Sequence, residues 1–237
     1  MPTFRIPRNI TTRKAEKRFD PRKGMDGLFA REAIRSGEIV WVSVLRPEDC
    51  AFYTWEQIQK DPVLTRYSYQ IGADLFSVSK DVESDVSNFF NHSCDPNTWY
   101  DDSVATRARM FLEYGAREWS DDPASPFRGG FSEIEKRFAE YAAGRPPKKG
   151  DSPLFDRALE LFEETLAKDD RIEYIVARRD IAKDEEVTMD YATFWVVNDL
   201  EFECHCGAKA CRKHLKAADY RLQNPHHVSS FVRTLFR

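Results

Sequence analysis

The sequence predicts a mainly β fold with helical insertions, and two kinds of pattern support this. Short runs of β-branched and aromatic residues, such as 39–42 (Ile-Val-Trp-Val), are bounded by turn residues, which is typical of strands. Two longer stretches, 131–143 and 154–167, space their large apolar residues three and four apart, which indicates amphipathic helices.

The first half of the chain is predicted to form short strands and one helix. Residues 24–44 predict a strand, a turn and a strand, and residues 67–79 predict two short strands. Residues 54–64 are expected to form a short helix that Pro62 closes, because proline disrupts a helix interior. Residues 104–112 are expected to form a further strand.

The second half is predicted to place the two amphipathic helices between linkers. Residues 118–130 are rich in Asp, Pro, Ser and Gly, and residues 144–153 in Pro, Gly and Lys, which indicates loops. Strand character returns at 173–177 and 187–190, and residues 226–236 are expected to form a short helix.

The composition is that of a folded protein without a bulk signal for nucleic-acid binding. Of 237 residues, 41% are apolar and 13% aromatic, which excludes a disordered chain. The net charge is −4, whereas proteins that bind polyanions usually carry a basic excess. Residues 1–23 differ, with eight Lys or Arg against two acidic residues. This basic N-terminal arm is expected to be solvated and partly disordered, or else to contact acidic partners or nucleic acid.

The expected location is inside the cell, without membrane association. The start of the chain is polar and Arg-rich and lacks the apolar segment of a signal peptide. No apolar run approaches the roughly 18 to 20 residues that span a bilayer. Five cysteines, an odd number, argue against a disulfide framework and fit a reducing compartment.

Three cysteines near the C-terminus have the spacing of a metal site. Cys204, Cys206 and Cys211 lie within eight residues, and thiolates so close can surround one tetrahedral zinc ion. A chance cluster of buried thiols is the alternative, although Gly207 supplies the tight turn that a zinc knuckle needs. A structural zinc site has four ligands, and the candidates for the fourth are Cys94, Cys50, His205, His214 and His92.

The run Asn91-His92-Ser93-Cys94-Asp95-Pro96-Asn97 is the most informative motif. Its residue types alone would also suit a polar turn. Together with Asp190-Tyr191 and the cysteines downstream, however, it strongly resembles the SET domain. Three further stretches agree in order and character, namely 27–30, 179–191 and 202–212, so that the resemblance covers residues 24–112 and 171–215.

The resemblance implies a SET-domain β-fold in which the segment of Asn91 and His92 and the segment of Asp190 and Tyr191 are threaded into a pseudoknot. Such threading is an exception to the usual rule for chain connections. It also implies that Cys94 is the fourth zinc ligand. The expected organisation is a basic arm (1–23), a first SET part (24–112), a helical insertion (113–170), a second SET part (171–200), a post-SET zinc segment (201–215) and a C-terminal tail (216–237).

The implied activity is methyl transfer from S-adenosylmethionine to a lysine side chain. A lysine ammonium has no lone pair, and at its usual pKa of about 10.4 only roughly one lysine in a few thousand is neutral at pH 7. An apolar channel and a nearby sulfonium lower that pKa, and a tyrosine hydroxyl can orient the neutral amine. The family's Asp-Tyr motif places this tyrosine at Tyr191. Tyr67 is the expected second aromatic wall, with Tyr69 as the alternative, although both could equally be core aromatics.

The cofactor contacts are also carried over from the resemblance. Asn91 and His92 are expected to meet the adenosine part, and Gly27 to let the backbone approach the methionine part closely. Phe202 is expected to cover the adenine, unless it is a core residue. The full set of expected cofactor residues is Met25, Asp26, Gly27, Leu28, Phe29, Asn88, Asn91, His92, Tyr191 and Phe202.

Three positions depart from the family pattern. Met25 replaces the first glycine of a Gly-x-Gly turn, which Gly24 could relieve one residue earlier, and Asn88 replaces an arginine. Both changes put cofactor affinity in question. Met189 stands where many members have Phe or Tyr. Because its flexible thioether removes a hydroxyl that would hold water, more than one methylation is expected.

The leading substrate class is a histone tail, because a post-SET zinc tail is most associated with chromatin enzymes. A non-histone protein is the close alternative, and a catalytically weak SET fold that binds a peptide or partner is a rival of another class. A plain zinc knuckle that binds nucleic acid is disfavoured by the acidic balance. The nucleus is favoured over the cytoplasm, although residues 145–149 are too short for a nuclear signal. The insertion is expected to shape the substrate groove, to bind a partner or to have no direct role.

Overall fold

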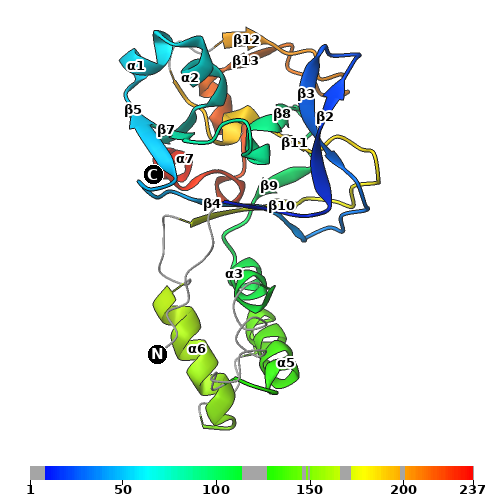
Figure 1. Cartoon of the computed structure of the whole chain (residues 1–237), viewed down its shortest axis with the longest axis vertical. Coiled ribbons are helices and arrows are strands. Elements are labelled where there is room, and N and C mark those ends of the chain that lie inside the picture. Colours follow the sequence, from blue (N-terminus) through cyan, green and yellow to red (C-terminus); the bar gives the residue numbers. More distant parts are fainter. Residues whose placement is uncertain are drawn as a thin grey trace. The chain divides into compact units, whose positions relative to one another are not determined.

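The computed structural model describes residues 9–113, 127–145, 148, 150–165, 172–197 and 201–236. The chain divides into two compact units (Figure 1). The first comprises Arg8–Asp101 and Glu173–Arg237 and contains the sheets, and the second comprises Met1–Pro7 and Asp102–Ile172 and contains three longer helices. The predicted mainly β fold with helical insertions is therefore confirmed.

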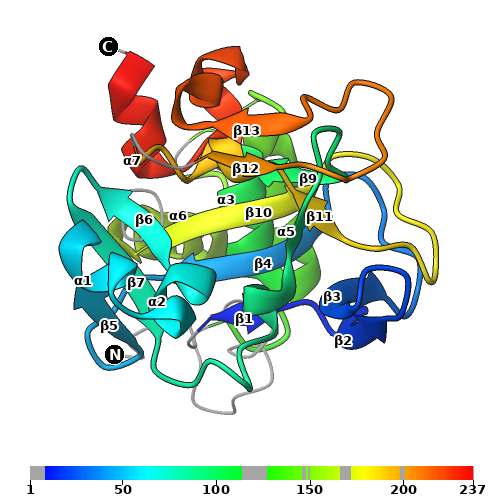
Figure 2. The same cartoon turned by 90° about the horizontal axis from the view of Figure 1, so that it is seen from above.

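A four-stranded sheet forms the centre of the first unit (Figure 2). Its strands, in spatial order, are β1 (Ile10–Thr11), β4 (Ile39–Val44), β10 (Ile172–Ala177) and β9 (Thr98–Tyr100). Every residue of β4 and β10 is buried. Both strands are therefore almost continuous apolar runs rather than alternating ones.

A second sheet has the order β5-β7-β6, with β5 at Cys50–Tyr53, β7 at Leu75–Ser79 and β6 at Tyr69–Gly72. Two short helices, α1 (Trp55–Gln59) and α2 (Pro62–Tyr67), connect β5 to β6. The prediction of one helix closed by Pro62 is wrong. Pro62 instead begins α2, where its missing N–H is not needed, and the side chain of Asp61 caps the helix.

Strands β2 (Ala15–Asp20) and β3 (Met25–Ala30) form an antiparallel hairpin that is paired along its whole length. At its tip, the buried carboxylate of Asp20 accepts hydrogen bonds from Arg22. Residues 1–8 of the expected basic arm lie outside the described residues. Within the remainder, residues 15–20 are not a solvated arm, because they form strand β2 and their backbone pairs with β3.

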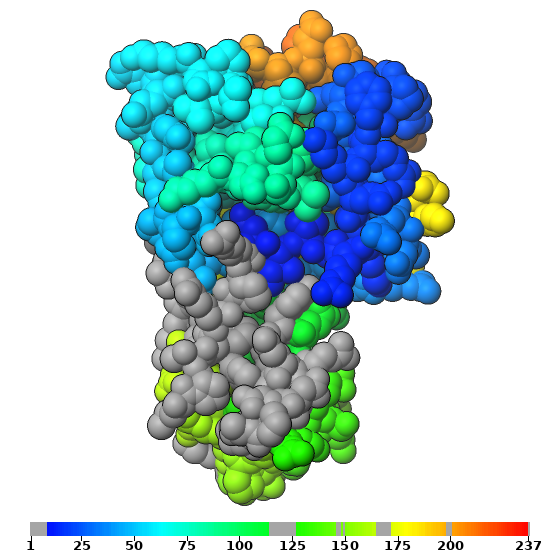
Figure 3. Space-filling view, in the orientation of Figure 1, coloured from blue at the N-terminus to red at the C-terminus, as the bar shows by residue number. Residues whose placement is uncertain are grey.

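Short elements complete the first unit. They are η1 (Val86–Phe89), β8 (Asn91–His92), β11 (Thr188–Met189), η3 (Tyr191–Thr193), β12 (Glu201–Glu203), β13 (His214–Lys216), η4 (Ala217–Leu222), η5 (Pro225–His227), α7 (Ser230–Arg233) and η6 (Thr234–Phe236). The helix expected at 226–236 thus forms as α7 with 3-10 turns on both sides. In the space-filling view, the segment of β12 and β13 (orange) lies between the cyan α1–α2 region and the blue β2–β3 hairpin (Figure 3).

The second unit is built from α3 (Val104–Phe111), α5 (Phe131–Ala142) and α6 (Pro153–Thr165). The two helices expected at 131–143 and 154–167 are confirmed. Their apolar faces meet in an aromatic core, in which the ring of Phe138 lies 5.1 Å from that of Phe111 and 5.3 Å from that of Phe162. None of the helices in the described ranges is long and apolar enough to cross a membrane.

The strand expected at 104–112 is wrong, because these residues form α3. The side chain of Ser103 accepts a hydrogen bond from the backbone N–H of Thr106 and so caps the helix. Ala108, Met110 and Phe111 are buried together on α3, an arrangement that local β-propensity does not reveal. Most of the loop expected at 118–130 lies outside the described residues.

Candidate active site and metal centre

Two segments that are almost a hundred residues apart in sequence lie side by side at the centre of the first unit. Strands β8 and β11 pair in parallel, with Asn91 opposite Thr188 and His92 opposite Met189. The backbone N–H of Ser93 continues the pairing to the carbonyl oxygen of Met189, at 2.9 Å. The side chain of Asn97 holds the same segments together, because its amide oxygen accepts the N–H of Thr188 at 2.8 Å. The adjacency that the resemblance implied is present.

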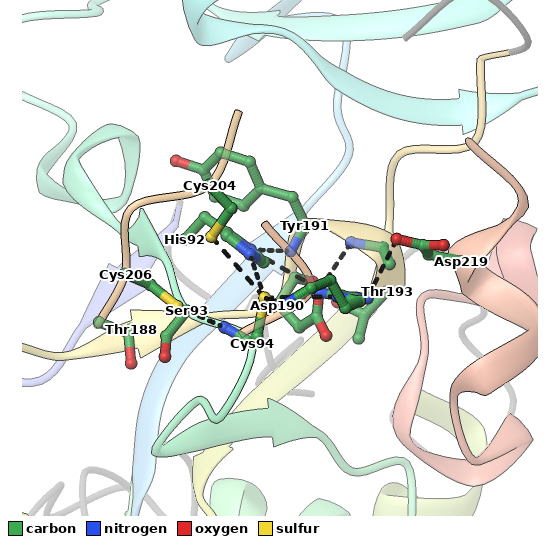
Figure 4. Close-up of polar contacts among 12 residues, drawn as sticks. His92, Ser93, Cys94, Thr188, Asp190, Tyr191, Thr193, Cys204, Cys206 and Asp219 are labelled. Atoms are coloured by element: carbon green, nitrogen blue, oxygen red, sulfur yellow. Dashed lines mark hydrogen bonds and ion pairs between the residues drawn. The ribbon is translucent and has the colours of Figure 1, made fainter. Parts of the chain in front are cut away.

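Tyr191 follows β11 directly and begins η3, which the Asp190 side chain caps (Figure 4). The hydroxyl of Tyr191 donates a hydrogen bond to the carbonyl oxygen of Phe90 at 2.7 Å, and its backbone N–H donates to Nδ1 of His92 at 3.2 Å. Burial raises the pKa of Tyr191 to about 12. The hydroxyl is therefore neutral at physiological pH and acts as a hydrogen-bonding group.

A cavity lies against this tyrosine, and its lining combines aromatic side chains with polar ones, among them Asn9, Asp85 and several serines. Its lining includes Tyr67, Tyr69, Phe194 and Trp195 together with Tyr191, and further members are Trp41, Phe90, Met189, Arg66 and Asn88. The structure thus brings the expected pair Tyr67 and Tyr191 to one cavity. Tyr69, the alternative wall residue, lines it as well, but its hydroxyl is hydrogen-bonded to Tyr100 and Glu173.

Some of the residues expected to bind the cofactor lie around Gly27, and others lie around the ring of His92. Near Gly27 on β3, the side-chain amide of Asn91 donates to the carbonyl oxygen of Asp26 at 3.1 Å and to Glu186 at 2.8 Å. A Cβ built on Gly27 would lie 2.8 Å from Oε1 of Glu186 and 2.9 Å from Nδ2 of Asn91. A side chain at this position would require the ends of the Glu186 and Asn91 side chains to move. Gly24, which directly precedes Met25, has a φ of +66°, in line with the expectation that it relieves the turn beside Met25.

The ring of His92 packs in a cluster with the rings of two other expected site residues, Tyr191 and Phe202. It is 5.3 Å from the ring of Tyr191 and 5.6 Å from that of Phe202, edge to face with the latter. Burial lowers the pKa of His92 to about 4, so that the ring is neutral and its Nδ1 can accept the N–H of Tyr191. Phe202 is only partly buried and forms part of this aromatic group rather than of the core.

Other expected cofactor residues point elsewhere. Leu28 and Phe29 are almost fully buried, at 0% and 5% exposed, so their side chains belong to the core. The side-chain amide of Asn88 donates to the carbonyl oxygen of Val82 at 3.0 Å, and Met25 is exposed. Asn88 does line the aromatic cavity.

Four cysteines converge beside this group, and three of them, Cys94, Cys204 and Cys206, are labelled in Figure 4. The sulfur atoms of Cys94, Cys204, Cys206 and Cys211 all lie within 4.8 Å of one another, and those of Cys94 and Cys204 are 3.7 Å apart. Tetrahedral zinc with Zn–S bonds of about 2.3 Å places its sulfurs about 3.8 Å apart, so this donor set fits a zinc ion. Of the candidates for the fourth ligand, Cys94 is the one that groups with the other three cysteines.

Arg212 is a residue whose role the sequence did not reveal. Its guanidinium lies 2.6 Å from Oδ1 of Asp190, and its Nε lies 3.3 Å from the sulfur of Cys94. Asp190 is 4% exposed and also accepts the side-chain amide of Gln223 at 3.1 Å. One side chain therefore joins the cysteine cluster to the residue before Tyr191. In the sequence, only the position of Arg212 directly after Cys211 could have indicated that its side chain lies near the cysteines.

Comparison with known proteins identifies the fold of the first unit. Residues 26–114 match the family model of the SET domain, so the chain carries a SET domain. No curated protein matches the chain in a sequence search.

Several solved structures are similar at low sequence identity. A candidate histone methyltransferase of Plasmodium falciparum is 15% identical, with a TM-score of 0.35, over 76% of this chain and 94% of that one. KRYPTONITE, solved with mCHG DNA and SAH, is 16% identical, with a TM-score of 0.39, over 83% of this chain and 27% of its own. The methyltransferase domain of human histone-lysine N-methyltransferase SETMAR is 17% identical, with a TM-score of 0.38, over 81% of this chain and 54% of its own.

Proposed function

We propose that this chain transfers a methyl group from S-adenosylmethionine to a lysine side chain of a protein. One observation carries the proposal. Strands β8 and β11 pair in parallel, Tyr191 lies after β11 on the wall of the cavity, and its hydroxyl donates to the carbonyl oxygen of Phe90. Tyr191 and Tyr67 are the proposed catalytic residues, and the SET domain supports methyl transfer as the reaction class.

The proposed cofactor site lies between β3 and β8. S-adenosylmethionine supplies a methyl group on a positively charged sulfur. The absent side chain of Gly27 lets the backbone come close to a ligand, beside the carboxylate of Glu186, which is bonded to Lys23 and Asn91. The faces of His92 and Phe202 suit an aromatic ring. Asn91 is the proposed polar contact beside them.

The cavity suits the deprotonation that methyl transfer requires. Lowering a lysine pKa from about 10.4 to about 7 takes roughly 4–5 kcal/mol of differential stabilisation. Aromatic walls from Tyr67, Phe194 and Trp195 disfavour the charged ammonium by removing its water. Because the pKa of Tyr191 is about 12, its hydroxyl is not the base that takes the proton, and its role is to orient the neutral amine.

The four-cysteine cluster is proposed to bind one structural zinc ion. Its ligands come from Cys94, which follows β8, and from Cys204, Cys206 and Cys211 around the β12–β13 hairpin. Zinc would therefore fasten that hairpin, which carries Phe202, beside Asn91 and His92. A site closed by four thiolates leaves no open position for chemistry, so the ion has no catalytic step.

A histone tail is the leading proposed substrate, and a non-histone protein is the alternative. Both the histone substrate and a location in the nucleus are proposed because a post-SET zinc tail is most associated with chromatin enzymes.

Met189 lines the cavity next to Tyr191 and is 3% exposed. Its flexible side chain leaves room for more than one methylation. The second unit is proposed to shape the substrate groove or to bind a partner.

The test is transfer of a labelled methyl group. The purified chain is incubated with methyl-labelled S-adenosylmethionine and either histones or a cell extract. Label on lysine that disappears in Tyr191→Phe but persists in the matched variant Tyr53→Phe, a tyrosine that does not line the cavity, supports the proposal. Cofactor binding without label on any protein would contradict it and favour a binding module.

A further inference from the structure

Strand β10 carries one acidic side chain in the interior of the first unit, that of Glu173. It is 5% exposed, and burial raises the pKa of its carboxyl. A carboxyl in this environment needs hydrogen-bond partners to be tolerated. Oε1 accepts the backbone N–H of Ser230 at 2.7 Å, and Oε2 accepts the hydroxyl of Tyr69. One side chain thus joins the C-terminal helix α7 to the first residue of β6.

Tyr69 connects this carboxyl to the proposed lysine cavity. Its ring is stacked on that of Phe194, with centroids 5.0 Å apart and an interplanar angle of 17°. The ring of Phe194 in turn lies 5.4 Å from that of Tyr191. All three rings line the cavity. A second hydrogen bond, of 2.6 Å to the hydroxyl of Tyr100, directs the Tyr69 hydroxyl away from Tyr191 and into the core.

The C-terminal segment, defined as residues 225–236, is attached to the same region at two other points. The backbone N–H of Ser229 donates to the carbonyl oxygen of Thr193 at 2.9 Å, inside the turn that follows Tyr191. The ring of His227 is stacked on that of Trp99 at 3.7 Å. Val228 and Val232 are fully buried. The C-terminal segment is therefore part of the folded unit that surrounds the cavity.

We propose that Glu173 is a positioning residue that fastens the C-terminal segment to Tyr69 and thereby fixes the Tyr69–Phe194 wall of the lysine cavity. The inference rests on the proposed methyl transfer. Tyr69 contributes its ring to the wall, and its hydroxyl serves as the anchor. Glu173 acts through Tyr69 and does not touch the substrate.

The position of Glu173 determines which step should change when it is removed. Its hydrogen bonds in the described structure go to Tyr69 and Ser230, and not to Gly27, Asn91 or His92. Loss of the carboxyl leaves the N–H of Ser230 without this acceptor and leaves the Tyr69 hydroxyl with Tyr100 alone, which weakens the anchor of the Tyr69 ring. Small displacements of groups that orient a reactant can lower turnover by one to two orders of magnitude. Cofactor affinity has no reason to change.

The experiment compares variants of the full chain by kcat, by the KM of each substrate and by the ratio of mono-, di- and trimethylated product. We expect Glu173→Ala to lower kcat at least about tenfold and to change the product ratio, with the dissociation constant of S-adenosylmethionine within about twofold of wild type. Glu173→Gln retains a group that can accept the N–H of Ser230, and we expect it to keep kcat within about threefold of wild type. Tyr69→Phe keeps the stacked ring but removes the hydroxyl that anchors it, so we expect kcat to fall in the same direction as in Glu173→Ala.

Ser230→Pro removes the N–H donor without touching Glu173. Ser230 is the first residue of α7, where proline is accepted, and the φ of −57° and ψ of 158° at Ser229 suit a residue before proline. We expect the same direction of change as in Glu173→Ala. This variant carries the test if Glu173→Ala does not fold.

A measurement that needs no turnover separates this inference from the proposed function. Hydrogen exchange followed by mass spectrometry should lose protection at residues 69–72, 191–196 and 228–233 together in Glu173→Ala and Ser230→Pro, and not at 24–30. If wild type transfers no methyl group, the proposed function fails and hydrogen exchange still tests the coupling. The inference would be overturned if a folded Glu173→Ala or Ser230→Pro kept the kcat, the product ratio and the protection of wild type. It would also be overturned if the affinity for S-adenosylmethionine fell by the same factor as kcat.

Discussion

The guanidinium of Arg212 lies 2.6 Å from the carboxylate of Asp190 and also contacts the sulfur of Cys94. The side chain of Arg212 is 16% exposed and that of Asp190 4% exposed, so the pair is largely shielded from water. Asp190 directly precedes Tyr191, and Cys94 follows the strand that pairs with β11. The four-cysteine cluster and the proposed active site are therefore linked by a buried ion pair.

Replacing Arg212 by leucine should destabilise the first unit and loosen the zinc segment. Asp190 would keep its bonds from Ala192 and Gln223 but lose a charged donor in a buried place. We expect a loss of about 1–3 kcal/mol in the free energy of unfolding, measured by chemical denaturation. Arg221→Leu, at an exposed arginine of η4, is the matched control. Equal stability of the two variants would mean that the buried pair contributes nothing.

Replacing Cys94 by serine should remove the metal from the purified protein. We expect about one zinc ion per chain in wild type, measured by atomic spectroscopy, and a substoichiometric amount in Cys94→Ser, because zinc binds thiolate far better than a hydroxyl. Cys50→Ala changes a buried cysteine outside the cluster and should keep the ion. Undiminished zinc in Cys94→Ser would show that the four-cysteine site is not the metal site.

The parts of the structure that were predicted correctly are those with a strong local signal. The buried strands β4 and β10 and the helices α5 and α6 follow from apolar runs and helical spacing. Residues 104–112 were predicted to form a strand, whereas a cap at Ser103 and burial in the fold make them the helix α3.

The candidate site shows the same division. Spacing alone indicated three metal ligands and left five candidates for the fourth, and only the resemblance singled out Cys94. No local pattern could place Glu173, because an acidic residue in a strand normally faces water. Its partners Tyr69 and Ser230 are 104 and 57 residues away, so that only the folded chain brings these groups together.

Replacing Gly27 by alanine should weaken cofactor binding. The added methyl group would come within 3 Å of Glu186 and Asn91, which must then move. We expect the dissociation constant of S-adenosylmethionine to rise about tenfold, measured by calorimetry, which corresponds to about 1.4 kcal/mol. Gly24→Ala is an informative control, because its Cβ meets no atom within 4 Å but its φ is +66°. It therefore reports backbone strain in the same hairpin without crowding.

A smaller effect in Gly27→Ala than in Gly24→Ala would contradict the close approach of β3 to the cofactor. Strain at Gly24 would then be the more important feature of the hairpin.

The pKa of Tyr191 predicts how stability depends on pH. Burial raises this pKa from 10 to about 12 in the folded chain, so the unfolded chain loses the phenol proton first as the pH rises. The contribution of Tyr191 is therefore fully present below about pH 10 and is lost between about pH 10 and 12, by roughly 2–3 kcal/mol at most. Tyr69 and Tyr100 also have raised pKa values and contribute a similar trend. The difference in unfolding free energy between wild type and Tyr191→Phe isolates the effect of Tyr191. Denaturant titrations from pH 8 to 11.5 should show this difference falling only above about pH 10. A difference that instead rises between about pH 8 and 10 would mean that the folded-state pKa of Tyr191 is lowered into the range where a catalytic base would work.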